Sequence, residues 1–149
     1  MPLALAACGF TPAYAPQGSA RALLGRVRAA DPTTKNAFDF VERVEERIGR
    51  PEDHRYDLAY SVITEKVSAG LTRDNRTTRF NLKGAVDFAL KDVKTGETLS
   101  KGRIQNFTGY GATGSTVAGL AAEEDAALRL MRILADQVVT RLIADLARG

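Results

Sequence analysis

Three consecutive segments of this sequence alternate apolar and polar side chains, and that period of two limits the fold more than any other feature of the chain. The alternation is clearest over residues 79–93, and similar patterns run over residues 56–67 and 98–110. Side chains of a strand point alternately to its two faces, so each segment is predicted to be a strand with one apolar face. Polar turns over residues 72–76 and 92–97 separate the three. The sequence therefore predicts an antiparallel meander with one face available for helices.

A strand and a helix are expected before the meander. A short apolar stretch predicts the strand over residues 22–29. Residues 35–49 then carry apolar side chains every three or four positions, which is the spacing of one helix face, and Gly49 with Pro51 ends that helix. In the last strand of the meander Gly102 breaks the alternation, which predicts a β-bulge there.

The longest element is expected at the C-terminal end. The glycine-rich residues 109–119 predict a flexible lead, and residues 118–147 repeat apolar side chains every three or four positions without a proline. At 1.5 Å per residue such a helix is about 40 Å long, so one end is expected to extend beyond the sheet. Because sheets and helices must each bury an apolar face, the economical fold is α+β. It is a four-stranded, mostly antiparallel sheet with two helices packed on one face, and the C-terminal helix is long.

The beginning of the sequence has the features of a bacterial lipoprotein. Leu5-Ala6-Ala7-Cys8 fits the lipobox, in which small residues precede a cysteine that receives lipid on its sulfur. We expect residues 1–7 to be a truncated signal peptide, because the basic segment that opens such peptides is missing. Residues 8–20 would be the lipidated tether and residues 21–149 a single α/β domain. The alternative is a short apolar N-terminus with an incidental buried cysteine.

Positive charge is concentrated in one part of the chain. The total is only +3, from 21 Lys and Arg against 18 Asp and Glu, but residues 71–104 carry eight basic and four acidic side chains. Lys and Arg suit phosphate and carboxylate groups because they form charge-assisted contacts with several donors. The alternative is a solvated sheet edge, since outward basic residues also protect strands from aggregation. The candidate anion-binding residues are Arg73, Arg76, Arg79, Lys83, Lys101 and Arg103.

The composition argues against catalysis, metal binding and nucleic-acid binding. One Cys and one His leave no disulfide framework, Cys-rich zinc site or His pair, so no metal, cofactor or catalytic residue is expected. His54 lies in a polar loop and is expected to be a surface residue. The mild positive charge and core-like phenylalanines do not favour nucleic acid as a partner. We therefore expect a binding protein and not an enzyme.

Several short motifs follow one another along the chain. The lipobox continues into Cys8-Gly9-Phe10-Thr11-Pro12-Ala13-Tyr14, and the strand Arg79-Phe80-Asn81-Leu82 is followed by the turn Lys94-Thr95-Gly96-Glu97. The last helix is introduced by Gly114-Ser115-Thr116-Val117-Ala118 and begins with Asp125-Ala126-Ala127. In this order the motifs resemble the lipopolysaccharide-assembly lipoprotein family, LptE, in its alphaproteobacterial form. The Cys-Gly-Phe-Thr-Pro start is the most specific of them.

The resemblance implies a function that works by binding. Such proteins look like two helices packed on a four-stranded sheet, and they sit as a plug inside the outer-membrane β-barrel LptD. There they help the barrel to assemble and lipopolysaccharide to pass to the outer leaflet. The resemblance implies that the six basic residues contact the phosphorylated glycolipid and that lipid on Cys8 anchors the chain. Gly9 after the cysteine, where aspartate would signal retention, favours the outer membrane by analogy.

The expected partners are therefore an LptD-type barrel, lipopolysaccharide and the periplasmic face of the outer membrane, with no nucleic acid and no cofactor. The alternative is a generic periplasmic lipoprotein that binds an anionic ligand on its sheet face and has no barrel partner. Depletion separates the two, because only the first predicts a loss of lipopolysaccharide at the cell surface.

Overall fold

The computed structural model describes residues 18–71, 73 and 77–148 of the chain. Its elements, in chain order, are α1 (Ser19–Leu23), β1 (Val27–Ala29), α2 (Lys35–Ile48), β2 (Tyr56–Leu71), β3 (Thr77–Asp92), β4 (Thr98–Gly111) and α3 (Thr116–Leu146). None of the helices in these residues is both long and apolar enough to cross a membrane.

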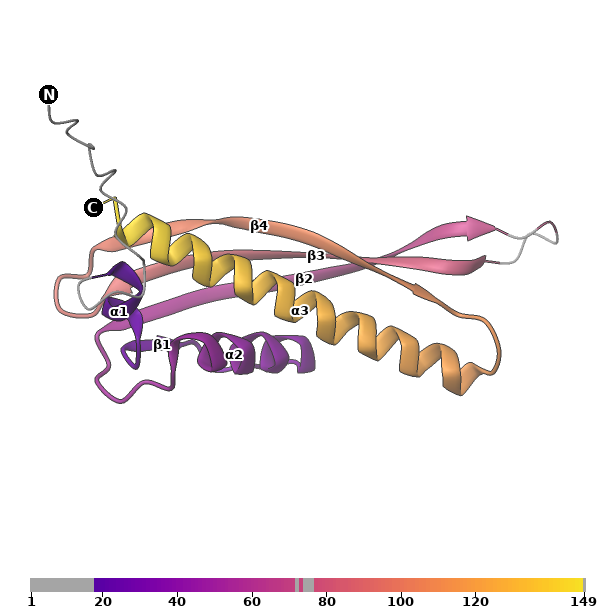
Figure 1. Cartoon of the computed structure of the whole chain (residues 1–149), viewed down its shortest axis with the longest axis horizontal. Coiled ribbons are helices and arrows are strands. Elements are labelled where there is room, and N and C mark those ends of the chain that lie inside the picture. The colour runs from indigo at the N-terminus through magenta and orange to yellow at the C-terminus, as the bar shows by residue number, and fades with distance from the viewer. Residues whose placement is uncertain (1–17, 72, 74–76, 149) are drawn as a thin grey trace, which may run out of the picture.

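One layer of the molecule is a four-stranded sheet, and helices α2 and α3 form the other (Figure 1). The strands lie in the order β1-β2-β3-β4, with β1 parallel to β2 and the two following pairs antiparallel. Helix α2 makes the crossover that a parallel pair of strands needs. The predicted α+β fold, with a meander and two helices on one face, is confirmed.

Helix α2 begins and ends at capping residues. The Thr34 hydroxyl accepts a hydrogen bond from the Ala37 N–H at 3.1 Å, and Gly49 has a φ of 78°, which ends the helix. Phe40 is fully buried, whereas Phe38 is 57% exposed. The predicted helix is confirmed, and only one of its two phenylalanines belongs to the core.

Helix α3 is 31 residues long, about 46 Å at 1.5 Å per residue. Its Ser115 cap accepts a hydrogen bond from the Ala118 N–H at 3.2 Å. The buried side chains of α3 pack on β3, β4 and α2. Asp136 ties the two helices together, because its carboxylate accepts hydrogen bonds from Arg43 Nε at 2.9 Å and from an Arg47 guanidinium nitrogen at 2.8 Å.

The strand predicted over residues 22–29 is wrong in its first part, because only Val27–Ala29 pair with the sheet. Before it, α1 is a single helical turn whose Leu23 is fully buried in the core. Gly25 has a φ of 66°, and its N–H bonds the Ile48 carbonyl at 2.7 Å. This bend turns Leu23 back over the end of the core, so its side chain does not enter the sheet.

The β-bulge predicted at Gly102 is also wrong. Gly102 pairs regularly with Phe88, and the register shifts at Leu99, between the pairs Leu90–Ser100 and Lys91–Thr98. A Cβ atom at Gly102 would lie 3.4 Å from the Phe88 ring. The glycine thus makes room for a core aromatic ring.

The flexible lead predicted over residues 109–119 is much shorter. Strand β4 continues to Gly111, and α3 begins at Thr116, so residues 112–115 connect them. Because β2 and β3 have 16 residues each, the sheet is about 53 Å long at 3.3 Å per residue, somewhat longer than α3. The helix crosses the sheet obliquely (Figure 1), and its first turns lie outside the core, where Val117 and Leu120 are 76% and 59% exposed.

Candidate functional site

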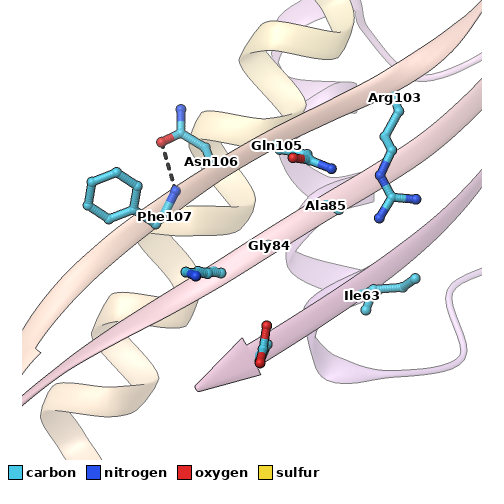
Figure 2. A pocket seen from close by; sticks show the side chains of 9 residues that line it. Ile63, Gly84, Ala85, Arg103, Gln105, Asn106 and Phe107 are labelled. Carbon is cyan, nitrogen blue, oxygen red and sulfur yellow. Dashed lines mark hydrogen bonds between the residues drawn. The ribbon is translucent and has the colours of Figure 1, made fainter. Parts of the chain in front are cut away.

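The face of the sheet opposite α2 and α3 is uncovered in the described part of the chain (Figure 2). Side chains alternate between the two faces, so the neighbours of the core residues Leu82 and Val86 point to this outer face. The strand register places Ile63 of β2, Ala85 of β3 and Gln105 of β4 in one row across it. The outer face is therefore built by three long strands whose pairing holds its side chains in place.

A shallow hollow of about 430 Å³ lies in the middle of the outer face. Two of its lining side chains are large and apolar yet exposed, Ile63 at 54% and Phe107 at 60%. The charged residues Glu65, Lys83 and Arg103 also line the hollow. Figure 2 shows Arg103 on the same face as Ile63 and Phe107. Exposed apolar groups rimmed by charge are typical of surfaces that bind a partner or an amphipathic ligand.

The predicted basic residues that the structure describes are exposed, but they do not form a single cluster. Lys83 pairs with Phe107 of β4, and Phe107 is six residues from Lys101 on the same strand. At 3.3 Å per residue, Lys83 and Lys101 are therefore about 20 Å apart along the sheet. Four of them project from the outer face: Arg79, Lys83, Lys101 and Arg103. Arg73 is exposed in the β2–β3 connection. Two predicted site residues, Arg76 and Cys8, lie outside the described residues.

Acidic residues on the same face reduce its positive charge. Arg103 donates a hydrogen bond to the Asp87 carboxylate at 2.8 Å, across the β3–β4 pair. Lys83 stands opposite Glu65 in the β2–β3 register. The outer face thus carries a line of basic side chains interrupted by carboxylates, which suits a ligand with separated negative groups.

A second polar cluster, which was not predicted, lies on the helix side of the sheet. Lys66 Nζ donates to the Glu123 carboxylate at 2.9 Å, which raises the pKa of Lys66 and lowers the pKa of Glu123. The neighbouring Tyr110 hydroxyl is buried beside this pair, and burial together with the Glu123 carboxylate raises its pKa. This cluster holds the beginning of α3 against β2. A lysine at a core-facing position of a predicted strand was the available signal, because such a charge needs a partner.

The single histidine and the acidic side chains of the described residues do not form a metal site. His54 is an exposed residue whose Nε2 lies 2.7 Å from the Asp57 carboxylate. No three His, Cys, Asp or Glu side chains of these residues stand close enough together to hold a metal ion.

The sequence matches a family model over residues 26–142, which cover the sheet and most of α3. The model is that of LptE, described as lipopolysaccharide-assembly. No curated protein is significantly similar to this sequence.

Solved structures of bacterial lipoproteins share the fold. A Caulobacter crescentus protein described as a lipoprotein superposes with a TM-score of 0.73 at 24% identity, over 88% of this chain and 97% of that one. Rare lipoprotein B of Shewanella oneidensis has a TM-score of 0.62 at 14% identity, over 80% and 92%. Lipoprotein B of Nitrosomonas europaea has a TM-score of 0.54 at 19% identity, over 80% of this chain and 82% of that one. At these identities the likeness is one of fold.

Proposed function

The chain belongs to the LptE family of lipopolysaccharide-assembly proteins, and from this premise we propose that it is an outer-membrane lipoprotein that forms a plug complex with an LptD-type β-barrel. In that complex it assists the transport of lipopolysaccharide to the outer leaflet and its assembly there. The role is one of binding, without a catalytic step. Family membership supports the part in lipopolysaccharide assembly, and the barrel complex is the finer proposal.

The outer face of the sheet carries this proposal. Ile63 and Phe107 stay exposed beside Lys83 and Arg103, in a hollow formed by rigid strands. A surface with both apolar and charged groups can bind the wall of a protein partner or a glycolipid with acyl chains and anionic groups.

We propose that the basic residues contact the anionic groups of lipopolysaccharide. The candidates are Arg73, Arg76, Arg79, Lys83, Lys101 and Arg103, and their spread along β3 and β4 favours several separate contacts over one phosphate site. Lys83 and Arg103 are the sharpest candidates because they line the hollow together with apolar side chains.

We also propose that lipid on Cys8 anchors the chain at the periplasmic face of the outer membrane. Residues 1–7 would be removed as signal peptide, and the tether would run from Cys8 to the beginning of α1 at Ser19, where the domain starts. Two or three acyl chains anchor stably where one would be marginal. A Cys8→Ser protein expressed with a complete signal peptide should then leave the outer-membrane fraction.

The central experiment is co-purification with the LptD-type barrel of the same bacterium in mild detergent. We expect the wild-type chain to retain the barrel, and depletion of the chain to reduce lipopolysaccharide at the cell surface. Failure to retain the barrel, with lipopolysaccharide transport unaffected by depletion, would instead support a lipoprotein that binds an anionic ligand without a barrel.

The glycolipid contacts are tested separately with purified lipopolysaccharide. A double variant, Lys83→Ala with Arg103→Ala, should weaken binding, because it removes both basic groups from the hollow. Lys91→Ala with Lys94→Ala is the matched control, because it also removes two exposed basic side chains, at the β3–β4 turn and away from the hollow. Equal losses in both proteins would mean that binding follows net charge alone and does not use the hollow.

A further inference from the structure

Strand β4 forms one edge of the sheet, and the direction of its backbone groups can be worked out from the register. The Ala112 N–H bonds the Thr78 carbonyl at 3.0 Å, so these two residues form a hydrogen-bonded pair. Antiparallel pairs alternate between hydrogen-bonded and non-hydrogen-bonded, and the β3–β4 register is unbroken from Gly111 to Ser100. Residues with odd numbers from 101 to 109 therefore direct their N–H and C=O groups away from β3.

At one end of this edge, two of the outward backbone groups are already hydrogen-bonded to side chains. The Phe107 N–H donates to the Asn106 side-chain oxygen at 2.8 Å (Figure 2), and the Gly109 carbonyl accepts a hydrogen bond from Arg129 at 3.4 Å. Both contacts agree with the direction derived from the register. At the other end, the register shift at Leu99 interrupts the ladder. The part left open between these ends runs from Lys101 to Gln105.

The open part of β4 has three outward N–H groups and three outward C=O groups, on Lys101, Arg103 and Gln105. No hydrogen bond to these N–H groups occurs within the described residues. A groove of about 520 Å³ lies between this edge and the exposed side of α3, lined on the helix by Gln137, Thr140 and Arg141. There is thus room beside the edge for one more extended backbone.

We propose that an extended segment of the barrel partner pairs with β4 over Lys101–Gln105 and adds a fifth strand to the sheet; this inference rests on the proposed function. Addition of a strand to an exposed sheet edge gains affinity from main-chain hydrogen bonds. The side chains of Lys101 and Arg103 point to the outer face, so the incoming strand is expected to carry carboxylates opposite them.

A second copy of this chain fits the edge less well. Antiparallel pairing of β4 with its own copy, centred on Arg103, would place the two Arg103 side chains directly opposite one another. Like charges at directly opposed positions destabilise a strand pair. The charge of the edge therefore favours an acidic partner strand over self-association.

Proline at position 105 tests the pairing with little effect on the fold. The Gln105 N–H points away from β3, so Gln105→Pro removes an outward donor and leaves the β3–β4 ladder intact. Gln105→Ala is the matched control, because it shortens the same side chain and keeps the N–H. Both proteins should keep the circular dichroism spectrum and urea midpoint of the wild type. With purified, detergent-solubilised barrel, Gln105→Pro should bind about tenfold more weakly than Gln105→Ala, and the comparison of Gln105→Ala with the wild type gives the contribution of the side chain alone.

Hydrogen exchange keeps the inference testable should Gln105→Pro fail to fold. Addition of the barrel to the wild-type chain should slow exchange at the amides of residues 101, 103 and 105, which are open in the free protein. A wild-type chain that binds the barrel with these amides still exchanging freely overturns the strand addition and leaves the plug role standing. A wild-type chain that does not bind the barrel overturns both. Protection of the same amides in the chain alone at high concentration would assign the edge to a second copy and overturn the partner named here.

Discussion

Gly84 of β3 lies directly beneath Leu130 of α3, so closely that a Cβ atom on the glycine would stand 2.9 Å from Leu130 Cδ2. The same atom would lie 3.0 Å from Leu134 Cδ1. Leu130 and Leu134 are fully buried and have little freedom to move. The absence of a side chain at this one position therefore sets how closely the helix approaches the sheet.

Gly84→Ala should destabilise the protein by about 1–3 kcal/mol, because an added methyl group in a filled core forces the leucines or the helix to shift. Urea unfolding followed by circular dichroism measures the change. Gly111→Ala is the control, since its nearest contact would be an ordinary 3.8 Å. A Gly84→Ala protein as stable as the control would mean that α3 can lift from the sheet at no cost.

Gly119→Ala should have the opposite effect. Gly119 lies inside α3, and a Cβ atom there would meet nothing closer than the Ala112 side chain at 3.8 Å. Alanine in a helix interior is favoured over glycine by up to about 1 kcal/mol, so the urea midpoint should rise. A lower midpoint would show that the beginning of α3 needs the freedom of a glycine.

Asp136→Asn should destabilise the protein in a pH-dependent way. Partial burial alone would raise the pKa of Asp136, but the hydrogen bonds from Arg43 and Arg47 outweigh it and hold that pKa below the ordinary value. A carboxylate with a lowered folded-state pKa adds stability above its unfolded pKa, about 3.9, and loses it as the pH falls through the folded value. With a side chain 33% exposed, the effect at pH 7 should be about 1 kcal/mol.

Urea unfolding of wild type and Asp136→Asn at pH 7 and at successively lower pH tests this. The difference in unfolding free energy between the two proteins should be full at neutral pH, begin to shrink as the pH falls below about 4, and close below the folded-state pKa of Asp136. Asp125→Asn is the control, because the Asp125–Arg129 pair lies on the exposed surface of one helix and should contribute little. A gap that persists at low pH would assign the loss to packing and not to charge.

Thr34→Ala should cost about 1 kcal/mol through loss of the α2 cap. Thr34→Ser keeps the hydroxyl that accepts from Ala37 and should restore most of the stability. Thermal unfolding of the two variants beside the wild type gives the comparison. Equal melting temperatures for the alanine and serine variants would contradict a role for the hydroxyl.

Local patterns in the sequence predicted the parts of the fold that local chemistry decides. Helix α2 and the three long strands were found because capping residues and alternation act within a few positions. The turn of α1 was missed because it depends on a contact between Gly25 and Ile48, which are distant in sequence. Gly102 was misread for a similar reason, since its role is to accommodate Phe88 on the next strand.

In the candidate site, too, local patterns predicted some features and contacts between distant residues decided the others. Alternation placed the basic residues on one face, but only the strand register shows that Lys83 and Arg103 share a hollow while Lys101 lies farther along. Arg43 and Asp136, 93 residues apart, meet only because α3 packs on α2, and Lys66 meets Glu123 only because α3 packs on the sheet. No local pattern in the sequence reports such distances.

Helix α3, at about 46 Å, is longer than the roughly 30 Å hydrocarbon core of a bilayer. The described chain begins and ends at one end of the sheet, and the free ends of β2 and β3 lie at the other (Figure 1). A body standing lengthwise in the outer membrane would thus reach from one headgroup layer to the other. The lengths of α3, β2 and β3 set the distance between the two ends of the domain. Each whole turn added to α3, with matching residues in β2 and β3, would move the far end about 5.4 Å farther from the end where the described chain begins.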